Sequence, residues 1–293
     1  WRHRGGRRRG MAGRRLTFEA TTYRRRERWG TPREVDLDAL AGVDAQHGTF
    51  SSFDPETGRA LAVPNTPCPV LLGLRAEWSD TAEAALAEIP TEEPAGRITW
   101  MTNHATDDHL TPVDRIADVR PTTSVIATGR IVSAPRRLRG GHVIASIGDG
   151  TGSVDIAAYE PTGRLRQIVA ALAPGDAVTA VGGVRSRPLT INLERIEIVS
   201  TVDRYIKLEN PVCHSCGVHM KSRGRDAGYR CARCGATAPE EAAVTTVATA
   251  PEPGWYEAAL SAQRHLTMPS TRGARWSYGG VLRRDRAGGH EDL

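Results

Sequence analysis

Two Cys-x-x-Cys pairs place the strongest constraint on how this chain can fold. Cys213 and Cys216 form the first pair, and Cys231 and Cys234 form the second after 14 intervening residues. Four thiolates at this spacing can meet at the corners of a tetrahedron, which is the geometry that Zn²⁺ prefers. Because cysteine fills all four positions, the predicted site is closed and structural rather than catalytic. The sequence therefore predicts a zinc ribbon over residues 209–240.

Cysteine usage also bears on where the chain works. Five cysteines are present, and only Cys68 lies outside the two pairs. Two metal-binding pairs with one thiol left over indicate a reducing compartment rather than a disulfide framework, so we expect a cytoplasmic protein.

No apolar run approaches the roughly 20 residues of a membrane span, and no membrane partner is expected. Cys68 lies between two prolines beside an apolar run, which favours a buried structural thiol over a nucleophile.

From about residue 120 the sequence reads as a small β-barrel. Alternating apolar and polar residues predict five strands, with a short amphipathic helix between the third and the fourth. The predicted strands cover residues 124–132, 142–147, 153–159, 176–184 and 190–199, and the helix covers residues 164–172. This order is typical of an OB-fold, a barrel that holds single-stranded or irregular nucleic acid. A barrel that only joins proteins is the alternative to a nucleic-acid-binding domain over residues 120–202.

Basic side chains in the predicted loops of the barrel and on the ribbon are candidate nucleic-acid contacts. Arginine fits phosphate through its planar fork, and the loops that join strands one to two and four to five are the usual contact points of OB-folds. The candidates are Arg136, Arg137, Arg139, His142, Arg185 and Arg187 on the barrel, and Lys221, Arg223 and Arg225 on the ribbon. His142 could stack on a base or simply pack on its strand, and the ribbon could be a solvated hairpin. The net charge of +5 agrees with an anionic partner but does not by itself establish one.

The residues before the barrel form a different unit. Strands are predicted at 16–23 and 98–102 and twice within 60–74, and a helix is predicted at 80–89 with Asp80 as its N-cap. Residues 16–115 therefore predict a mixed α/β domain. Residues 1–15 are expected to be a disordered or truncated segment, and residues 241–293 a linker and C-terminal tail. The fold class is α+β and multidomain.

Several motifs occur in an order that is more specific than any one of them. They are TFE at 17–19, WGTPR at 29–33, PNTPCPVLLGLRAE at 64–77, TNHATDDHL at 102–110, GGHV at 140–143, AYEPT at 158–162, the ribbon itself, and GWYE at 254–257. Together they resemble the archaeal agmatidine synthetases, the tRNA(Ile) 2-agmatinylcytidine synthetase family, over roughly residues 16–266. The sequence departs from the family pattern at Asn65, Ala76 and His104-Ala105.

The resemblance implies an activity and an architecture. Members of the family use ATP to join agmatine to C2 of the wobble cytidine in an isoleucine tRNA with the anticodon CAU. It implies a ferredoxin-like domain over residues 16–115, followed by the OB-fold and the ribbon. The acidic motif of the family's ATP-binding kinase-like domain is not found in this sequence. We therefore expect the chain to supply tRNA binding and part of the substrate pocket, with ATP and Mg²⁺ bound outside it.

The family-like motifs also contain candidate residues for a substrate pocket. Agmatine is a dication, so its pocket needs carboxylates, and Glu77, Asp107 and Asp108 are the candidates. The pocket is completed in this hypothesis by Thr66, Arg75 and His109. A helix cap or turn is the alternative for the two aspartates, and Arg75 could bind a phosphate or pair with Glu77. No residue is assigned a catalytic role.

Two other functions compete with an ATP-dependent RNA ligase. A non-catalytic OB-fold and zinc-ribbon protein that binds single-stranded nucleic acid would carry the same two C-terminal domains. A zinc-ribbon subunit that acts through protein contacts is a third possibility. The proline-rich segment 64–77 favours the ligase, since a simple nucleic-acid binder has no need of the domain at 16–115.

Overall fold

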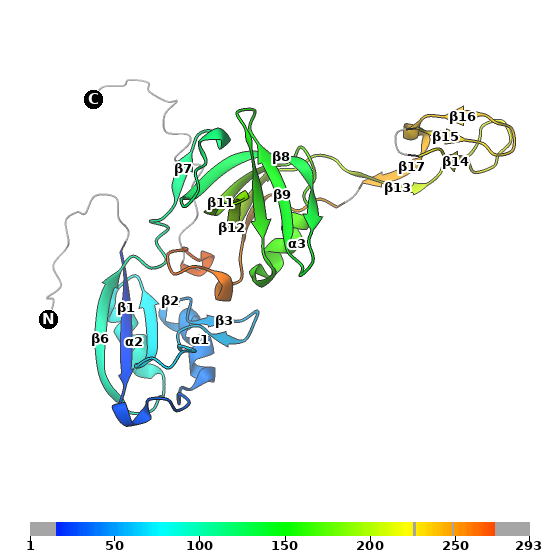
Figure 1. The fold of residues 1–293 in the computed structure, drawn as a ribbon. Helices are drawn as coiled ribbons and strands as arrows, with labels where there is room; N and C mark the ends of the chain where they lie inside the picture. Colours follow the sequence, from blue (N-terminus) through cyan, green and yellow to red (C-terminus); the bar gives the residue numbers. More distant parts are fainter. Residues whose placement is uncertain (1–15, 225–226, 248, 273–293) are drawn as a thin grey trace, which may run out of the picture.

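A computed structural model describes residues 16–224, 227–247 and 249–272 of the chain. Figure 1 shows three parts in chain order: a small helix-and-sheet domain, a β-barrel, and a ribbon held away from the barrel on a stalk. No helix in the described residues is long and apolar enough to cross a membrane. The predictions for residues 1–15 and for residues 273–293 of the tail lie outside the described part.

The first domain has ferredoxin-like topology. Its elements are β1 (Thr17–Arg24), α1 (Leu37–His47), β2 (Thr49–Phe50), β5 (Val70–Ala76), α2 (Ser79–Glu88) and β6 (Pro94–Thr102). The strands form an antiparallel sheet in the order β2-β5-β1-β6. A β-α-β-β-α-β chain order with the first strand at the centre is the ferredoxin-like arrangement, so this prediction is confirmed. A hairpin of β3 (Phe53–Asp54) and β4 (Arg59–Ala60) is inserted before β5.

Both helices cover one face of this sheet, and the other face is open. Leu40 and Val43 of α1 are buried against Leu72 and Leu74 of β5 in one apolar cluster. Along β1, Glu19 points to the opposite, helix-free face. That face carries polar side chains and the half-exposed Trp100 of the edge strand β6.

Helix α1 has clear end signals although the sequence analysis did not predict it. The Asp36 carboxylate accepts hydrogen bonds from the backbone N–H groups of Asp38 and Ala39, each at 3.0 Å. Gly48 ends the helix with a left-handed φ of 72°. Helix α2 was predicted, but its N-cap is Trp78 rather than Asp80, which lies inside the first turn.

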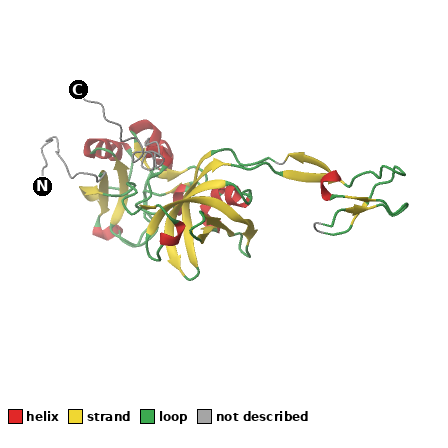
Figure 2. Ribbon diagram, turned by 90° about the horizontal axis from the view of Figure 1, so that it is seen from above, coloured by secondary structure: helices red, strands yellow, loops and turns green. Residues whose placement is uncertain are grey.

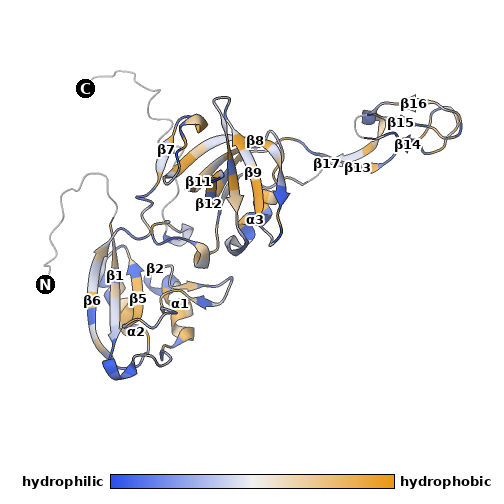
Figure 3. Cartoon of the chain, in the orientation of Figure 1, coloured by the Kyte–Doolittle hydropathy of each residue, from blue (hydrophilic) through white to orange (hydrophobic). Residues whose placement is uncertain are grey.

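The second domain is the predicted five-stranded barrel. Its elements are β8 (Ser124–Arg137), β9 (Val143–Gly148), β10 (Ser153–Ala158), η3 (Glu160–Thr162), α3 (Arg164–Ala170), β11 (Ala177–Ser186) and β12 (Leu189–Ser200). Parallel pairing of β10 with β12 closes the sheet into a barrel. Its interior is a single apolar cluster, and Figure 3 shows the corresponding apolar colouring along β9. The OB-fold prediction is confirmed.

Two further strands extend the barrel, and they correct the expectation for the C-terminal residues. Strand β7 (Thr111–Val113) lies parallel to β8, and β18 (Gly254–Glu257) pairs with β12. Residues 241–293 are therefore not simply a linker and a tail. The low-complexity part contains β17 (Val244–Val247), whose β-branched residues suit a strand.

The ribbon sits at the end of a two-stranded stalk. The stalk consists of β13 (Tyr205–Glu209) paired with β17, and Figure 2 shows it projecting from the barrel. Three short strands build the ribbon: β14 (Lys221–Ser222), β15 (Tyr229–Arg230) and β16 (Thr237–Ala238). Its buried apolar cluster consists of Cys213, Met220, Tyr229 and Cys231, which is too small a core to fold on hydrophobic burial alone.

Candidate nucleic-acid interface and metal centre

The four ribbon cysteines converge on one point. Their Sγ atoms all lie within 4.8 Å of one another, with separations of 3.5 Å between Cys213 and Cys234 and 3.4 Å between Cys216 and Cys231. Zinc–sulfur bonds of about 2.3 Å in a tetrahedron place the sulfur atoms about 3.8 Å apart, so the cluster fits Zn²⁺ with small shifts of the thiols. Gly217 and Gly235 donate N–H bonds back to the first cysteine of each pair and adopt left-handed φ angles. The turns of both knuckles therefore aim their thiols inward.

The electrostatics of the cluster also favour a bound cation. Backbone N–H groups of Cys234 and Arg233 lower the pKa of Cys231 to about 6. The hydrogen bond with Cys231 raises the pKa of Cys216 to about 12. Neighbouring thiols thus cannot all ionise by themselves, and a bound Zn²⁺ supplies the positive charge that stabilises four thiolates together. The structural zinc prediction is supported by both geometry and charge.

The ribbon presents basic side chains to solvent. Lys221 and Arg223 are exposed, whereas Arg225 lies outside the described residues. The Tyr229 ring is buried, and the ammonium group of Lys207 lies 4.7 Å from its centroid. Tyr229 therefore supports the ribbon rather than offering a surface for a base. The exposed charges suit phosphate contacts.

The barrel carries two groups of exposed arginines. Arg136 and Arg137 end β8, with Arg139 just beyond them, and Arg185 and Arg187 lie at the turn from β11 to β12. Within the described residues none of these five makes an ion pair with a carboxylate. An arginine without an acidic partner keeps its full charge available for a polyanion.

The two arginine groups border β10 rather than forming one patch. Arg137 pairs with Val143, which pairs with the last residue of β10, Ala158. The group of Arg185 and Arg187 precedes Thr190, which pairs with Asp155 near the start of β10. A strand advances about 3.3 Å per residue, so the groups flank a surface long enough for several nucleotides.

His142 is occupied within the barrel. Its Nδ1 accepts a hydrogen bond from the backbone N–H of Glu160 at 3.0 Å, and its ring meets that of Tyr159 edge-on at 5.3 Å. The hydroxyl of Tyr159 donates to the Asn192 side chain at 3.1 Å. These contacts agree with the strand-packing alternative for His142, although the residue stays half-exposed.

Among the predicted substrate-pocket residues, Thr66 lies apart from Glu77. Thr66 precedes β5 and Glu77 follows it, so the full length of the strand separates them. Glu77 pairs with Arg272, and Asp107 pairs with the fully buried Arg195. His109 donates to Glu194 at 3.0 Å. Asp108 is exposed and makes no ion pair within the described part of the chain.

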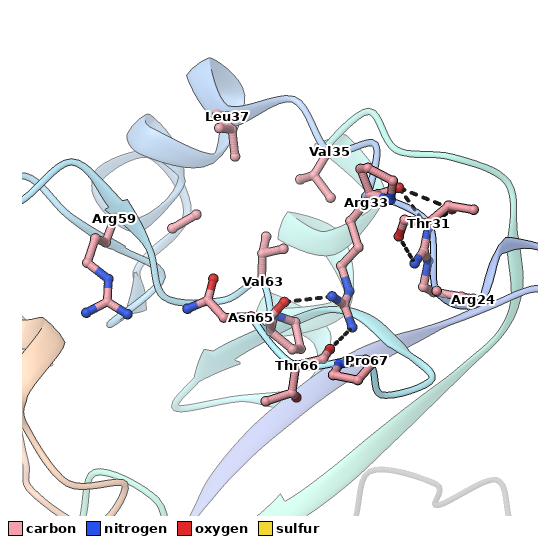
Figure 4. A pocket seen from close by; sticks show the side chains of 14 residues that line it. Arg24, Thr31, Arg33, Val35, Leu37, Arg59, Val63, Asn65, Thr66 and Pro67 are labelled. Carbon is pink, nitrogen blue, oxygen red and sulfur yellow. Dashed lines mark hydrogen bonds between the residues drawn. The ribbon is translucent and has the colours of Figure 1, made fainter.

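Thr66 instead lines a separate cavity of about 630 Å³ in the first domain, shown in Figure 4. There the Arg33 guanidinium donates to the carbonyl oxygens of Pro64, Thr66, Cys68 and Val70, at 2.7 to 2.9 Å, which holds the proline-rich turn rigid. The charged residues that line this cavity are all arginines. It therefore does not suit a dication such as agmatine.

A titratable cluster that the sequence analysis did not single out lies on the open face of the ferredoxin-like sheet. The Glu19 carboxylate accepts a hydrogen bond from His104 at 3.0 Å and lies 3.3 Å from Arg75. The ring of His265 stacks on that of His104, with centroids 5.2 Å apart. Glu19, Arg75 and His104 each lie in one of the family-like motifs, but these motifs are remote along the chain, so the sequence did not show that they meet.

We predict that Glu19 makes the first domain sensitive to acid. Burial raises the pKa of Glu19, but the hydrogen bond from His104 and the charge of Arg75 outweigh it and lower this pKa to about 2. A folded pKa below the unfolded value means that the stabilisation is complete above pH 4.5 and is lost as the pH falls towards 2. Glu19→Gln should lower the free energy of unfolding by about 2–3 kcal/mol at pH 7 and flatten this acid dependence. Urea unfolding at pH 7 and pH 3 measures both effects.

The matched control is Glu93→Gln, because Glu93 is a surface carboxylate with a side chain 72% exposed. It should leave the free energy of unfolding within about 1 kcal/mol of the parent chain. Equal stability of the two variants at pH 7 would contradict the role given to Glu19.

The fold and the site define a class. A ferredoxin-like domain, an OB-fold with unpaired arginines along its edges and a four-cysteine ribbon together form an architecture that is typical of multidomain proteins that bind nucleic acid. Family descriptions agree with each part: "TiaS FLD domain" matches residues 8–109, "OB-fold nucleic acid binding domain" residues 125–199, and "TiaS C-terminal zinc ribbon domain" residues 210–247.

Individual relatives show which proteins of that class the chain is similar to. The chain is 40% identical over 256 residues to the tRNA 2-agmatinylcytidine synthetase TiaS of Methanocaldococcus jannaschii, and 38% identical over 263 residues to that of Methanosarcina mazei. Both relatives are named for an isoleucine tRNA as substrate. The alignments cover 86% and 89% of the chain, and 60% of each relative. The chain is a homologue of the TiaS proteins and spans about three fifths of their length.

Solved structures show the same relationship. A TiaS complex with isoleucine tRNA and ATP superimposes with a TM-score of 0.74 at 34% identity, over 94% of this chain and 62% of that one. A TiaS complex with isoleucine tRNA, AMPCPP and agmatine gives a TM-score of 0.73 at 32% identity, over the same shares of the two chains. The resemblance seen in the sequence motifs is thus confirmed.

Proposed function

We propose that this chain is the RNA-binding part of an ATP-dependent ligase that joins agmatine to C2 of the wobble cytidine in the CAU-anticodon isoleucine tRNA. The observation that carries the proposal is the occurrence, in one chain and in order, of all three domains matched above. The relatives are named for this activity, and solved relatives hold isoleucine tRNA, ATP and agmatine. The expected location is the cytoplasm.

In this proposal the barrel and the ribbon hold the tRNA. The arginines that border β10 bind the phosphate backbone, and the zinc-stabilised ribbon adds charges at the far end of the stalk. The reacting carbon of a stacked cytidine is inaccessible, so the enzyme must take the base out of the stack. Phosphate contacts on both sides of the anticodon loop would hold the strand in that distorted conformation.

The first domain supplies part of the substrate site in this proposal. Among the predicted carboxylates, Asp108 is open to solvent and free to meet a cation, whereas Glu77 and Asp107 already pair with arginines. ATP and Mg²⁺ would bind outside the described residues, and ATP would supply the energy for the ligation.

A competition experiment tests the proposal. The zinc-loaded chain is bound to the CAU-anticodon isoleucine tRNA, with an elongator methionine tRNA and a single-stranded DNA as competitors. Salt is held constant because phosphate contacts make affinity strongly salt-dependent. Preference for the isoleucine tRNA supports the ligase, and equal binding of all three would replace it with a general single-strand binder.

Charge removal at one border of β10 should weaken binding in a defined way. Arg136, Arg137 and Arg139 are exposed and unpaired within the described residues, so replacing all three with glutamine should leave the fold intact. If all three contact phosphates, the slope of log affinity against log salt should become shallower by about 2–3. Titrations at several salt concentrations measure this slope. The matched control is Arg97→Gln, an exposed arginine on the first domain's β6, which should leave the slope unchanged.

A further inference from the structure

Three segments that are distant in sequence meet between the ferredoxin-like domain and the barrel. They are the connection 103–110 that links the two domains, the strap of residues 258–272 that follows β18, and Glu194-Arg195 of β12. The strap crosses from the barrel back to the first domain, where it appears in orange in Figure 1. Backbone N–H groups of Ala105 and Asp107 donate to His265 and Leu266 of the strap at 2.7 and 2.8 Å.

The centre of this junction is a closed ring of hydrogen bonds. Asp107 pairs with Arg195 through one carboxylate oxygen and accepts the backbone N–H of Met268 through the other, at 2.8 Å. Arg195 completes the ring by donating to the carbonyl oxygen of Met268 at 2.9 Å. The Arg195 side chain is fully buried and that of Asp107 is 7% exposed. The two opposite charges of the ring therefore compensate each other inside the protein.

A second set of contacts lies beside the ring. Glu194 accepts hydrogen bonds from His109 of the connection at 3.0 Å and from the Thr267 hydroxyl of the strap at 2.6 Å. Both are bonds to one buried carboxylate, and burial makes their loss costly. The barrel thus holds the connection and the strap at two adjacent residues of one strand.

The strap reaches the first domain through Arg272. Its guanidinium, whose side chain is 3% exposed, pairs with both carboxylate oxygens of Glu77 and donates to the carbonyl oxygen of Ala105. It also lies 5.6 Å from the centroid of the Phe50 ring. At the other end of the strap, the N–H of Ser261 donates to Asp54 at 3.0 Å.

The connection is also held in an unfavourable backbone conformation. Ala105 and Asp107 have left-handed φ angles of 57° and 62°, which residues other than glycine rarely adopt. Such angles persist where surrounding contacts fix them, and they mark segments under a functional constraint. A free linker between two domains would relax to ordinary angles.

We propose that Glu77, Asp107, Arg195 and Arg272 form an interdomain latch, in which they are positioning residues. The latch fixes the orientation of the ferredoxin-like domain on the barrel, so that one RNA can contact both at once. Two carboxylates of the family-like motifs thereby hold the protein together instead of binding a cationic substrate. The positioning of RNA rests on the proposed function, whereas the fixed orientation does not.

Amide hydrogen exchange on the full zinc-loaded chain tests the latch without RNA. Asp107→Asn removes the charge opposite Arg195, and Glu77→Lys places a cation against Arg272. Each substitution should speed amide exchange at positions 105 and 107 by about tenfold or more. The exchange rates of the amides in β1 and β11 should not change. Glu93→Lys is the surface control. The latch is overturned if the connection exchanges no faster than in the control, or if both domain cores open equally.

Rescue and RNA binding complete the test. The double variant Glu77→Lys, Arg272→Glu restores opposite charges and should slow exchange back towards the parent rate. The latch variants should bind the isoleucine tRNA about tenfold more weakly than the parent chain, and should bind a six-nucleotide single-stranded RNA equally well. Equal losses for both RNAs would overturn the positioning role. A parent chain that fails to prefer the isoleucine tRNA would overturn the proposed function while leaving the exchange result intact.

Discussion

Replacing Cys213 with serine is expected to unfold the ribbon and leave the two other domains folded. Cys213 is buried in a cluster with only three other buried side chains. The apolar core of the ribbon is therefore too small to keep it folded without zinc. Structural zinc contributes on the order of 10–16 kcal/mol to the folding of comparable small metal sites. Zinc content should fall from one ion per chain towards none, and amide protection over residues 210–240 should disappear.

The same substitution should weaken tRNA binding. Loss of the ribbon removes Lys221 and Arg223 from their fixed positions, and affinity for the isoleucine tRNA should fall by at least about tenfold at constant salt. Cys68→Ser is the matched control, because Cys68 is the cysteine that lies outside the cluster. It should keep the zinc, the protection of the ribbon and the tRNA affinity. A Cys213→Ser chain that still holds one zinc in a protected ribbon would refute the four-cysteine site.

Features encoded by local spacing could be predicted from the sequence. The cysteine knuckles are short turns whose residues are consecutive, and the barrel strands follow from alternation of apolar residues along each segment. Helix α1 was not predicted because Gly42 interrupts its interior, where glycine is unfavourable, and because just two of its residues, Leu40 and Val43, are buried. Strand β18 was not predicted because it is four residues long and follows a proline-rich stretch.

The junction could not be predicted because its partners are remote in sequence. Arg195 lies 88 residues from Asp107, and Arg272 lies 195 residues from Glu77. No sequence periodicity relates such residues. The sequence also does not distinguish a carboxylate that binds a ligand from one that pairs with an arginine. The hypothesis of one substrate pocket grouped Thr66 with Glu77, and the structure places these two residues before and after β5.

The ferredoxin-like domain should depend heavily on one buried ion pair. Arg24 binds Glu92 through two hydrogen bonds of 2.7 and 2.9 Å, and their side chains are 2% and 3% exposed. Arg24→Met removes the main partner of a buried carboxylate and should lower the free energy of unfolding by about 3–5 kcal/mol, measured by urea unfolding at pH 7. The control is Arg25→Met. Its partner Glu93 is 72% exposed, so the expected change is below about 1 kcal/mol.

A double variant separates the ion pair from the other contacts of Arg24. Arg24 also donates to the carbonyl oxygens of Thr31 and Pro32, at 2.7 and 3.0 Å. If the loss in Arg24→Met comes from stranding the Glu92 charge, then adding Glu92→Leu should recover at least about half of it, because apolar residues often replace buried ion pairs at little cost. If the double variant is no more stable than the single one, the bonds to the 31–32 turn carry the stability instead. The guanidinium would then serve chiefly to anchor that turn at the mouth of the arginine-lined cavity.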